Sequence, residues 1–138
     1  MPERGEQYIP HAHAESLGLK VVYGRPRLGV KGAWRPDEQV IVIRADLLWR
    51  QERCTLAHEI QHALAGDTPS PFGPLQWIQE ARADRRAADL LIEAGEFAAA
   101  EQLVGPYPGA IADELNVTLH LLLVWMAQVA VLPDRSSP

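Results

Sequence analysis

The sequence contains a single cysteine, Cys54, so no disulfide can form within the chain. This excludes a small secreted domain held together by disulfides and favours a reducing compartment, the cytoplasm of a bacterial cell.

Long apolar runs are also missing. The most apolar segment, residues 117–132, is shorter than a membrane span and carries His120 and Gln128, so we expect a buried helix there. The N-terminus has no apolar run behind a basic start, and we expect no signal peptide.

An excess of positive charge is missing as well. The net charge is −5, which favours neither nucleic acid nor an anionic membrane surface as a partner. Apolar residues make up 47% and charged residues 22% of the chain, as in an ordinary soluble globular protein. A length of 138 residues suits one domain with a modest core. We therefore expect a single domain over residues 1–138, with residues 1–8 and 133–138 as flexible tails.

The first third of the chain predicts a small sheet. A short helix is expected over residues 10–18, where Gly18 closes it. Two β-branched segments, 19–24 and 39–44, read as strands, and the Arg-Pro-Asp-Glu segment 35–38 reads as a turn. Together they indicate a small, antiparallel sheet.

Helices dominate the rest of the sequence. The pattern predicts a helix from about Leu47 to Ala65, which Gly66 stops, and a second long helix from residue 76 to near Gly95. The proline-rich stretch between them predicts an exposed loop. After a break at 106–109, a last helical stretch over 110–132 is expected to be interrupted near Asn116. The fold class is therefore α+β, a sheet packed with helices.

The segment "CTLAHEIQHALAGD" contains the pattern His-Glu-x-x-His. His58 and His62 lie four residues apart and project from one helix face, so both imidazoles can meet one tetrahedral Zn²⁺. Glu59 lies beside the first histidine, where it can take a proton from water without binding the metal. The pattern also occurs by chance, and the alternative is a pair of surface histidines.

A catalytic zinc needs a third protein ligand. Glu80 follows the proline-rich loop on the second long helix and is the candidate; Glu93 and Glu96 are less well placed rivals. Asp84 lies four residues further on the same face, where it can accept the second N–H of a liganding histidine. Its alternative is a salt bridge to Arg85. Small residues at Ala81, Ala83, Ala87 and Ala88 would let the two helices approach closely.

These motifs resemble the ImmA/IrrE family of zinc metallopeptidases, zincins whose third ligand is a glutamate. The family pattern looks like a "TLAHE-x-x-H" helix, then a glutamate, an alanine–acid pair and "AA-x-LL". Here those are residues 55–62, Glu80, Ala83–Asp84 and residues 87–91. Upstream, "GAWRPDEQVIVIRADL" is similar to the hairpin that precedes the active helix. The sequence departs from the family at Arg82 and Arg86, where many members carry an acid or an aromatic residue. From its length we expect none of the basic C-terminal DNA-binding or sensor extensions of some relatives.

The resemblance implies a zinc endopeptidase with a minimal zincin-like fold and one Zn²⁺ per chain. His58, His62 and Glu80 would hold the metal, Glu59 would be the catalytic base and Asp84 would orient a ligand. The implied substrate is a cognate repressor of a phage or mobile element. We expect the substrate backbone to add to an edge strand at Val40, Ile41, Val42 and Ile43. Tyr23, Tyr107 and His120 are candidates for stabilising the oxyanion.

Several features have a rival interpretation. A non-proteolytic regulatory module would keep the zinc for structure and bind a repressor or antitoxin through its C-terminal helices. Cys54 is expected to be a buried core residue rather than a ligand, and His11 and His13 to face solvent. The segment 110–127 loosely resembles a helix-turn-helix, but its second helix lacks the polar and basic side chains that contact DNA, so direct nucleic-acid binding is not expected.

Overall fold

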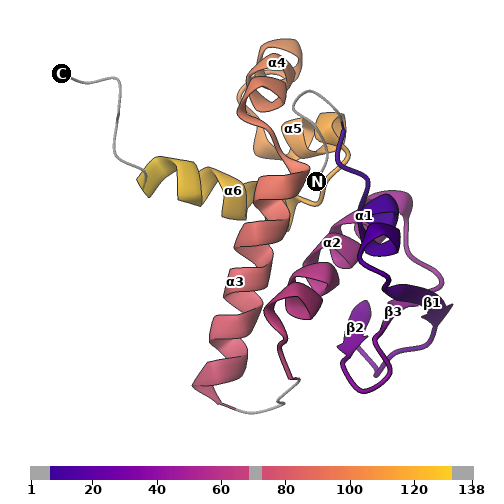
Figure 1. The fold of residues 1–138 in the computed structure, drawn as a ribbon. Coiled ribbons are helices and arrows are strands. Elements are labelled where there is room, and N and C mark those ends of the chain that lie inside the picture. The colour runs from indigo at the N-terminus through magenta and orange to yellow at the C-terminus, as the bar shows by residue number, and fades with distance from the viewer. Residues whose placement is uncertain (1–6, 69–72, 132–138) are drawn as a thin grey trace.

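The computed structural model describes residues 7–68 and 73–131 of the chain. These residues form the small α+β domain expected from the sequence (Figure 1). The elements in chain order are α1 (Pro10–Ser16), β1 (Lys20–Gly24), β2 (Gly32–Arg35), β3 (Val40–Arg44), α2 (Trp49–Ala65), α3 (Pro74–Leu91), α4 (Ala94–Val104), α5 (Pro108–Leu115) and α6 (Leu119–Val131).

The two expected tails, residues 1–8 and 133–138, lie almost wholly outside the described residues. Tyr8, however, is described, and it does not behave as part of a flexible tail. Its side chain is 4% exposed and packs in a hydrophobic cluster, while its carbonyl oxygen accepts a hydrogen bond from Arg53. The ordered domain therefore begins before the predicted boundary.

The sheet has three strands in the order β1-β3-β2 and is mixed rather than antiparallel throughout. β2 and β3 form the expected antiparallel hairpin, in which Ala33 pairs with Val42 and Trp34 with Ile41. β1 is parallel to β3, with Val22 beside Val42. The expectation of a purely antiparallel sheet was wrong, because the chain passes from β1 to the far edge and β3 then fills the gap between β1 and β2.

Helix α2 lies between the sheet and the other helices, with α1 beside it (Figure 1). Leu56 and Ile60 pack against Trp34, Ile41 and Ile43 of the sheet. The helix ends at Gly66, whose φ of 67° is left-handed, a conformation in which glycine carries no Cβ penalty. The predicted helix over 47–65 and its stop are therefore confirmed.

The second long helix is shorter at its end than the sequence predicted. α3 begins at Pro74 and ends at Leu91, because Ile92 adopts an extended conformation with φ −127° and ψ 120°. A separate helix, α4, then starts at Ala94 and includes Gly95, the predicted end point. Glycine usually weakens a helix interior, but Gly95 occupies the first turn of α4 and is exposed. Of the predicted proline-rich loop, residues 69–72 lie outside the described residues.

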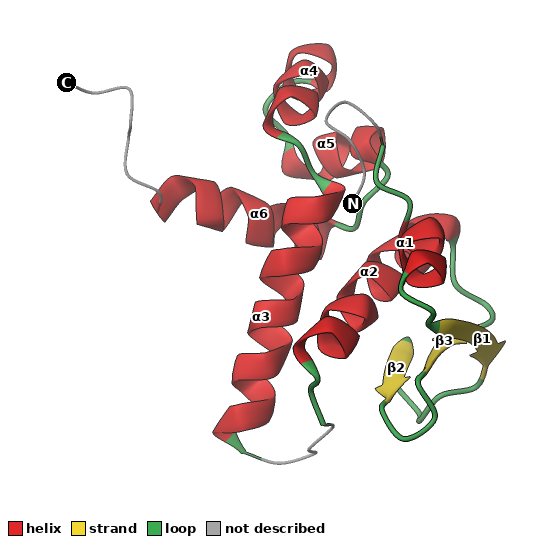
Figure 2. Ribbon diagram, viewed as in Figure 1, coloured by secondary structure: helices red, strands yellow, loops and turns green. Residues whose placement is uncertain are grey.

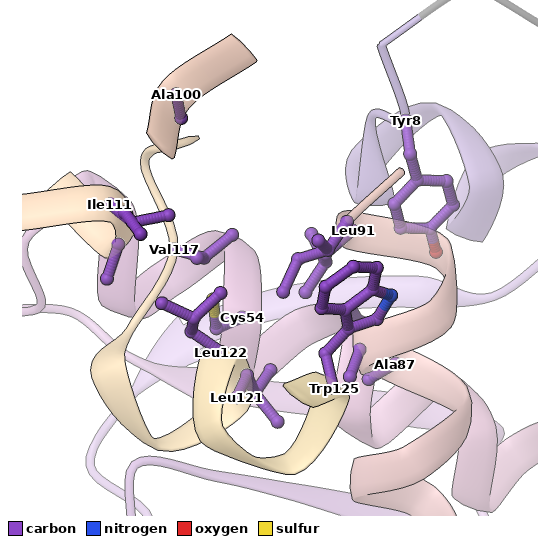
Figure 3. Close-up of a cluster of buried hydrophobic side chains, with 14 residues drawn as sticks. Tyr8, Cys54, Ala87, Leu91, Ala100, Ile111, Val117, Leu121, Leu122 and Trp125 are labelled. Carbon is purple, nitrogen blue, oxygen red and sulfur yellow. The ribbon is translucent and has the colours of Figure 1, made fainter. Parts of the chain in front are cut away.

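The C-terminal helices pack against α3 and one another (Figure 2). Asn116, left-handed with φ 56°, separates α5 from α6 at the predicted interruption. Leu121, Leu122 and Trp125 of α6 are buried against Ala87 and Leu91 of α3 (Figure 3). The expectation of a buried C-terminal helix is confirmed for this face of α6 only, because Leu119, Leu123 and Val129 on the same helix are 46–48% exposed.

No single helix in residues 7–68 and 73–131 is long and apolar enough to cross a membrane. α5 and α6 reach that composition only as a pair, and they are bent by 108° relative to each other.

Candidate metal centre

Helix α2 gathers the three residues of the His-Glu-x-x-His motif. The rings of His58 and His62 meet edge to face, with their centroids 4.8 Å apart and their Nε2 atoms 3.1 Å apart. One ligand atom from each histidine and one from Glu59 lie within 4.8 Å of one another. Glu59 is buried, and the side chains of His58 and His62 are 17% and 9% exposed, so the two histidines are not a solvated surface pair.

Glu80 of α3 brings a carboxylate to the two rings. Its Oε2 lies 2.6 Å from Nε2 of His58 and 3.1 Å from Nε2 of His62. Oε2 of Glu59 is farther away, 3.8 Å from the same His58 nitrogen. Glu80 therefore completes a compact donor set and Glu59 stands beside it. The rivals Glu93 and Glu96 are exposed and lie at the start of α4.

This donor set fits zinc. Two imidazole nitrogens and one carboxylate oxygen are typical ligands of a catalytic zinc, and tetrahedral bonds of about 2.0–2.1 Å hold ligand atoms about 3.3 Å apart. The three atoms here lie 2.6 to 3.1 Å apart, close to that separation. The side chain of Glu80 is about half exposed, which leaves one side of the cluster open.

Small side chains allow α3 to place Glu80 so close to α2. Ala83, Ala87 and Ala88 are all at most 1% exposed. Ala87 and Ala88 pack in one cluster with Cys54 and Ala57 of α2. Larger residues at these positions would hold the helices farther apart and the carboxylate away from the histidines.

Asp84 fixes the ring of His58, as the sequence predicted. Nδ1 of His58 donates to Oδ1 of Asp84 at 2.7 Å, which directs Nε2 toward Glu80. The other oxygen, Oδ2, lies 2.8 Å from Nε2 of His120 on α6. In the described part of the chain Asp84 therefore pairs with two histidines and not with Arg85. Burial disfavours its charge, but the two histidine hydrogen bonds outweigh burial and lower its pKa.

Asp67 holds the ring of His62 in the same way, a role that was not predicted from the sequence. Asp67 is 8% exposed, and Nδ1 of His62 donates to its Oδ2 at 2.8 Å. Its other oxygen accepts a hydrogen bond from Arg82 of α3. Arg82, which departs from the family pattern, thus ties α3 to the turn after α2. The sequence feature that could have predicted this contact is an acidic residue directly after Gly66. The chain turns at this glycine and brings Asp67 back to His62.

The acids around the histidines attract positive charge. Burial opposes protonation of His58, but Asp84 and Glu80 outweigh it and raise the pKa of His58 to about 10. Hydrogen bonds from His58 and His62 hold the pKa of Glu80 well below its usual range. A metal cation and protons compete for the same nitrogen and oxygen atoms, so this electrostatic arrangement also favours a metal.

Glu59 occupies a different environment from Glu80. Burial raises its pKa, and the histidines oppose this only in part. Its carboxylate accepts a hydrogen bond from the backbone N–H of Trp34 in β2. A buried carboxylate with a raised pKa, held in place by the backbone, is suited to accepting and returning a proton.

A cleft of about 410 Å³ opens at these residues. Glu59, His62 and Glu80 line one side of it, and β2 with the loop before it lines the other. The lining residues from that second side are Pro26, Arg27, Val30, Gly32, Ala33, Trp34 and Arg35. The arrangement leaves room for an extended chain between the edge of the sheet and the donor set.

The predicted substrate-binding segment, Val40 to Ile43, is in the wrong strand. β3 is central and pairs with β1 on one side and β2 on the other, so it has no free edge. Ile41, Val42 and Ile43 are at most 6% exposed and do not line the cleft. A run of β-branched residues indicates burial on both faces, which is typical of a central strand. The edge beside the cleft is β2.

The three candidates for oxyanion stabilisation also lie elsewhere. Tyr23 donates to Glu52 and contacts His11, and burial with that carboxylate raises its pKa to about 12. His120 contacts Asp84, and Tyr107 is 66% exposed before α5. None of the three lines the cleft.

The remaining predictions about single residues can be compared directly. Cys54 is 4% exposed, and burial raises the pKa of its thiol. The backbone N–H of Thr118 donates to its sulfur at 3.4 Å, so Cys54 is a core residue as expected. His11 stacks on Trp49 and pairs with Glu52, whereas His13 accepts or donates at Tyr8. The prediction that both histidines only face solvent was therefore wrong, because each contacts another side chain.

Comparison with known families gives one result. The model of Peptidase_M78, described as the IrrE N-terminal-like domain, matches residues 14–124, well over half of the chain. The matched span includes the sheet, α2, α3 and the whole donor set. No curated protein matches the sequence significantly.

Proposed function

Since the chain belongs to the IrrE N-terminal-like peptidase family, we propose that it is a zinc-dependent endopeptidase that cleaves a repressor-like regulatory protein of a phage or mobile element. The supporting observation is the convergence of His58, His62 and Glu80, whose ligand atoms lie within 3.1 Å of one another next to buried Glu59. Membership of the family supports peptidase activity. We further propose that the metal is zinc, that the substrate is a repressor and that the protein acts in the cytoplasm.

In this proposal His58, His62 and Glu80 hold one zinc ion. Zinc, when bound, would supply a Lewis acid that polarises the scissile carbonyl and acidifies water. Asp84 and Asp67 keep the Nδ1 proton of each histidine in place, so that both Nε2 atoms face Glu80. Glu59 takes the proton from the attacking water and delivers it to the leaving amine.

The substrate backbone is proposed to add to the outer edge of β2. The N–H of Arg44 donates to the carbonyl of Lys31 at 2.8 Å. Because antiparallel pairs alternate, the backbone groups of Gly32 and Trp34 then point away from β3. The Trp34 N–H reaches Glu59, which agrees with that direction. A peptide on this edge would therefore run past the proposed catalytic base.

The test compares wild type, Glu80→Ala and Glu59→Gln. Elemental analysis should find about one zinc per chain in wild type. In Glu80→Ala we expect the zinc affinity to fall by on the order of 10-fold or more, as for a lost ligand. Glu59→Gln should retain the metal, because Gln preserves the shape of the side chain and the three donors remain. Unchanged zinc affinity in Glu80→Ala would place the third ligand elsewhere.

Cleavage is then measured on the repressor encoded next to the gene. Wild type should cut it at one place, and Glu59→Gln should bind it without cutting, because no group remains to accept the proton of water. Cleavage that persists in Glu59→Gln would contradict the base assignment. Binding without cleavage by zinc-loaded wild type would favour the non-proteolytic module.

A further inference from the structure

We propose that the cleft selects substrates with an acidic side chain close to the scissile bond, and that Arg27 and Arg35 recognise it. Both arginines line the cleft together with Glu59 and Glu80. The inference rests on the proposed peptidase function and adds the charge of the preferred substrate.

Arg27 is held at the cleft by a tight turn in the loop between β1 and β2. The N–H of Val30 donates to the carbonyl of Arg27 at 3.0 Å, which closes the turn. Gly29, with φ 82°, supplies the left-handed conformation that the third position of such a turn requires. The backbone of Arg27 is thus fixed while its side chain stays exposed.

Arg35 is the last residue of β2, directly after Trp34, whose N–H contacts the proposed base. Side chains alternate along a strand, so a substrate residue opposite Arg35 on an added strand would share its face. Directly opposed residues have Cβ atoms about 4.5–5.5 Å apart, and opposite charges at that distance attract. An acid at that register would lie close to the peptide bond beside Glu59.

The acids in the cleft do not pair directly with these arginines, because each acid already has another partner. Asp67 pairs with His62 and Arg82, and Glu80 contacts both histidines. Glu59 is buried and accepts the Trp34 N–H.

Arg27 and Arg35, by contrast, have no ion-pair partner within residues 7–68 and 73–131. Arg27 and Arg35 are therefore the two charged side chains of the cleft that no carboxylate in the described residues pairs with, although the three lining carboxylates outnumber them. A carboxylate on the substrate is the group that two exposed guanidinium groups would bind.

The test measures peptide binding with zinc-loaded, full-length Glu59→Gln, which is not expected to cut. The probes are three pools of fluorescein-labelled peptides of mixed sequence that differ only at one central position, fixed as Glu, Gln or Lys. Fluorescence anisotropy should show the Glu pool bound about 5-fold more tightly than the Gln pool, and the Lys pool most weakly. Adding Arg27→Glu and Arg35→Glu together should reverse the order.

Arg25→Glu is the matched control. Arg25 is exposed in the same loop and each Arg→Glu substitution changes the charge equally, but Arg25 does not line the cleft, so the order of the pools should stay as in the parent. Equal binding of the three pools, or an order that Arg25→Glu reverses as well, would overturn the inference. Melting curves of the variants check that these exposed substitutions leave the fold intact.

Cleavage of the same pools by zinc-loaded wild type separates this inference from the proposed function. Cutting without a charge preference would overturn the inference and support the peptidase. A binding preference without cutting would support the recognition of acids and count against the peptidase. Neither binding nor cutting of any pool would count against both.

Discussion

At the scale of single residues, the site depends on carboxylates with different tasks. Glu80 contacts both histidine Nε2 atoms, Asp84 and Asp67 each hold one Nδ1, and Glu59 stays buried beside them. Each histidine therefore has an acid behind it that sets the tautomer and the direction of the ring.

Removing Asp67 should weaken the site without touching a ligand. Asp67→Ala leaves the His62 ring without its Nδ1 partner, and we expect zinc affinity to fall by about 10- to 100-fold. Competition with a fluorescent chelator measures this. Asp46→Ala is the control, because Asp46 also pairs with an arginine, Arg44, but is mostly exposed and far along the chain from the ligands. Equal zinc affinity in Asp67→Ala and wild type would show that His62 needs no such partner.

At the scale of elements, the position of β2 against α2 decides where the cleft opens. Gly32 is buried where the hairpin crosses the helix, and a Cβ built there would lie 2.6 Å from Cγ2 of Thr55. Because real Cβ atoms do not approach so closely, only glycine lets β2 lie this near to α2. The N–H of Trp34 can then reach Glu59.

Gly32→Ala should therefore destabilise the domain, by about 1–3 kcal/mol for an overpacked site. Urea unfolding measures the loss. Thr55→Ser removes the clashing methyl group, so the double variant should recover part of the stability. Gly24→Ala is the control, since its nearest neighbour would be Cγ1 of Val42 at 3.9 Å, an ordinary contact. A Gly32→Ala variant as stable as Gly24→Ala would contradict the close packing.

At the scale of the whole molecule, α2 joins two hydrophobic clusters. Leu56 and Ile60 face the cluster of the sheet and α1, whereas Cys54 and Ala57 face the cluster formed with α3 to α6. The donor set lies where α2 meets α3, with Glu80 contributed by α3. A metal bound there would link α2, which packs on the sheet, to α3, which packs on the C-terminal helices.

Removing the metal should consequently lower the stability of the whole domain. A ligand that binds only the folded state stabilises it by about 4 kcal/mol at a thousand times its dissociation constant. We expect the melting temperature of zinc-loaded wild type to fall on chelation and to recover when zinc is restored. Glu80→Ala should show a smaller shift under the same zinc concentration, because each tenfold loss of zinc affinity removes about 1.4 kcal/mol of this stabilisation. Identical melting curves with and without zinc would show that no metal links the helices.

Much of the site follows from local sequence. The four-residue spacing puts His58 and His62 on one face of any helix, with Glu59 next to them, and Gly66 ends that helix. Glu80 and Asp84 were predicted from their four-residue spacing on one face of the second long helix, and the structure brings both to the histidines. The break between α3 and α4 escaped notice because Ile92 is an ordinary residue that becomes extended only in its buried setting.

Tertiary structure decided what depends on residues far apart in the chain. The order of strands in a sheet is set by which edges meet. The β-branched segment 40–43 therefore indicated a strand buried on both faces, but it could not reveal that β2 borders the cleft. The pairing of Arg82 with Asp67 exists only because α3 folds back along the end of α2. Helix periodicity and turns are local properties that the sequence determines by itself, whereas edges, clefts and ion pairs between elements form only when the elements pack.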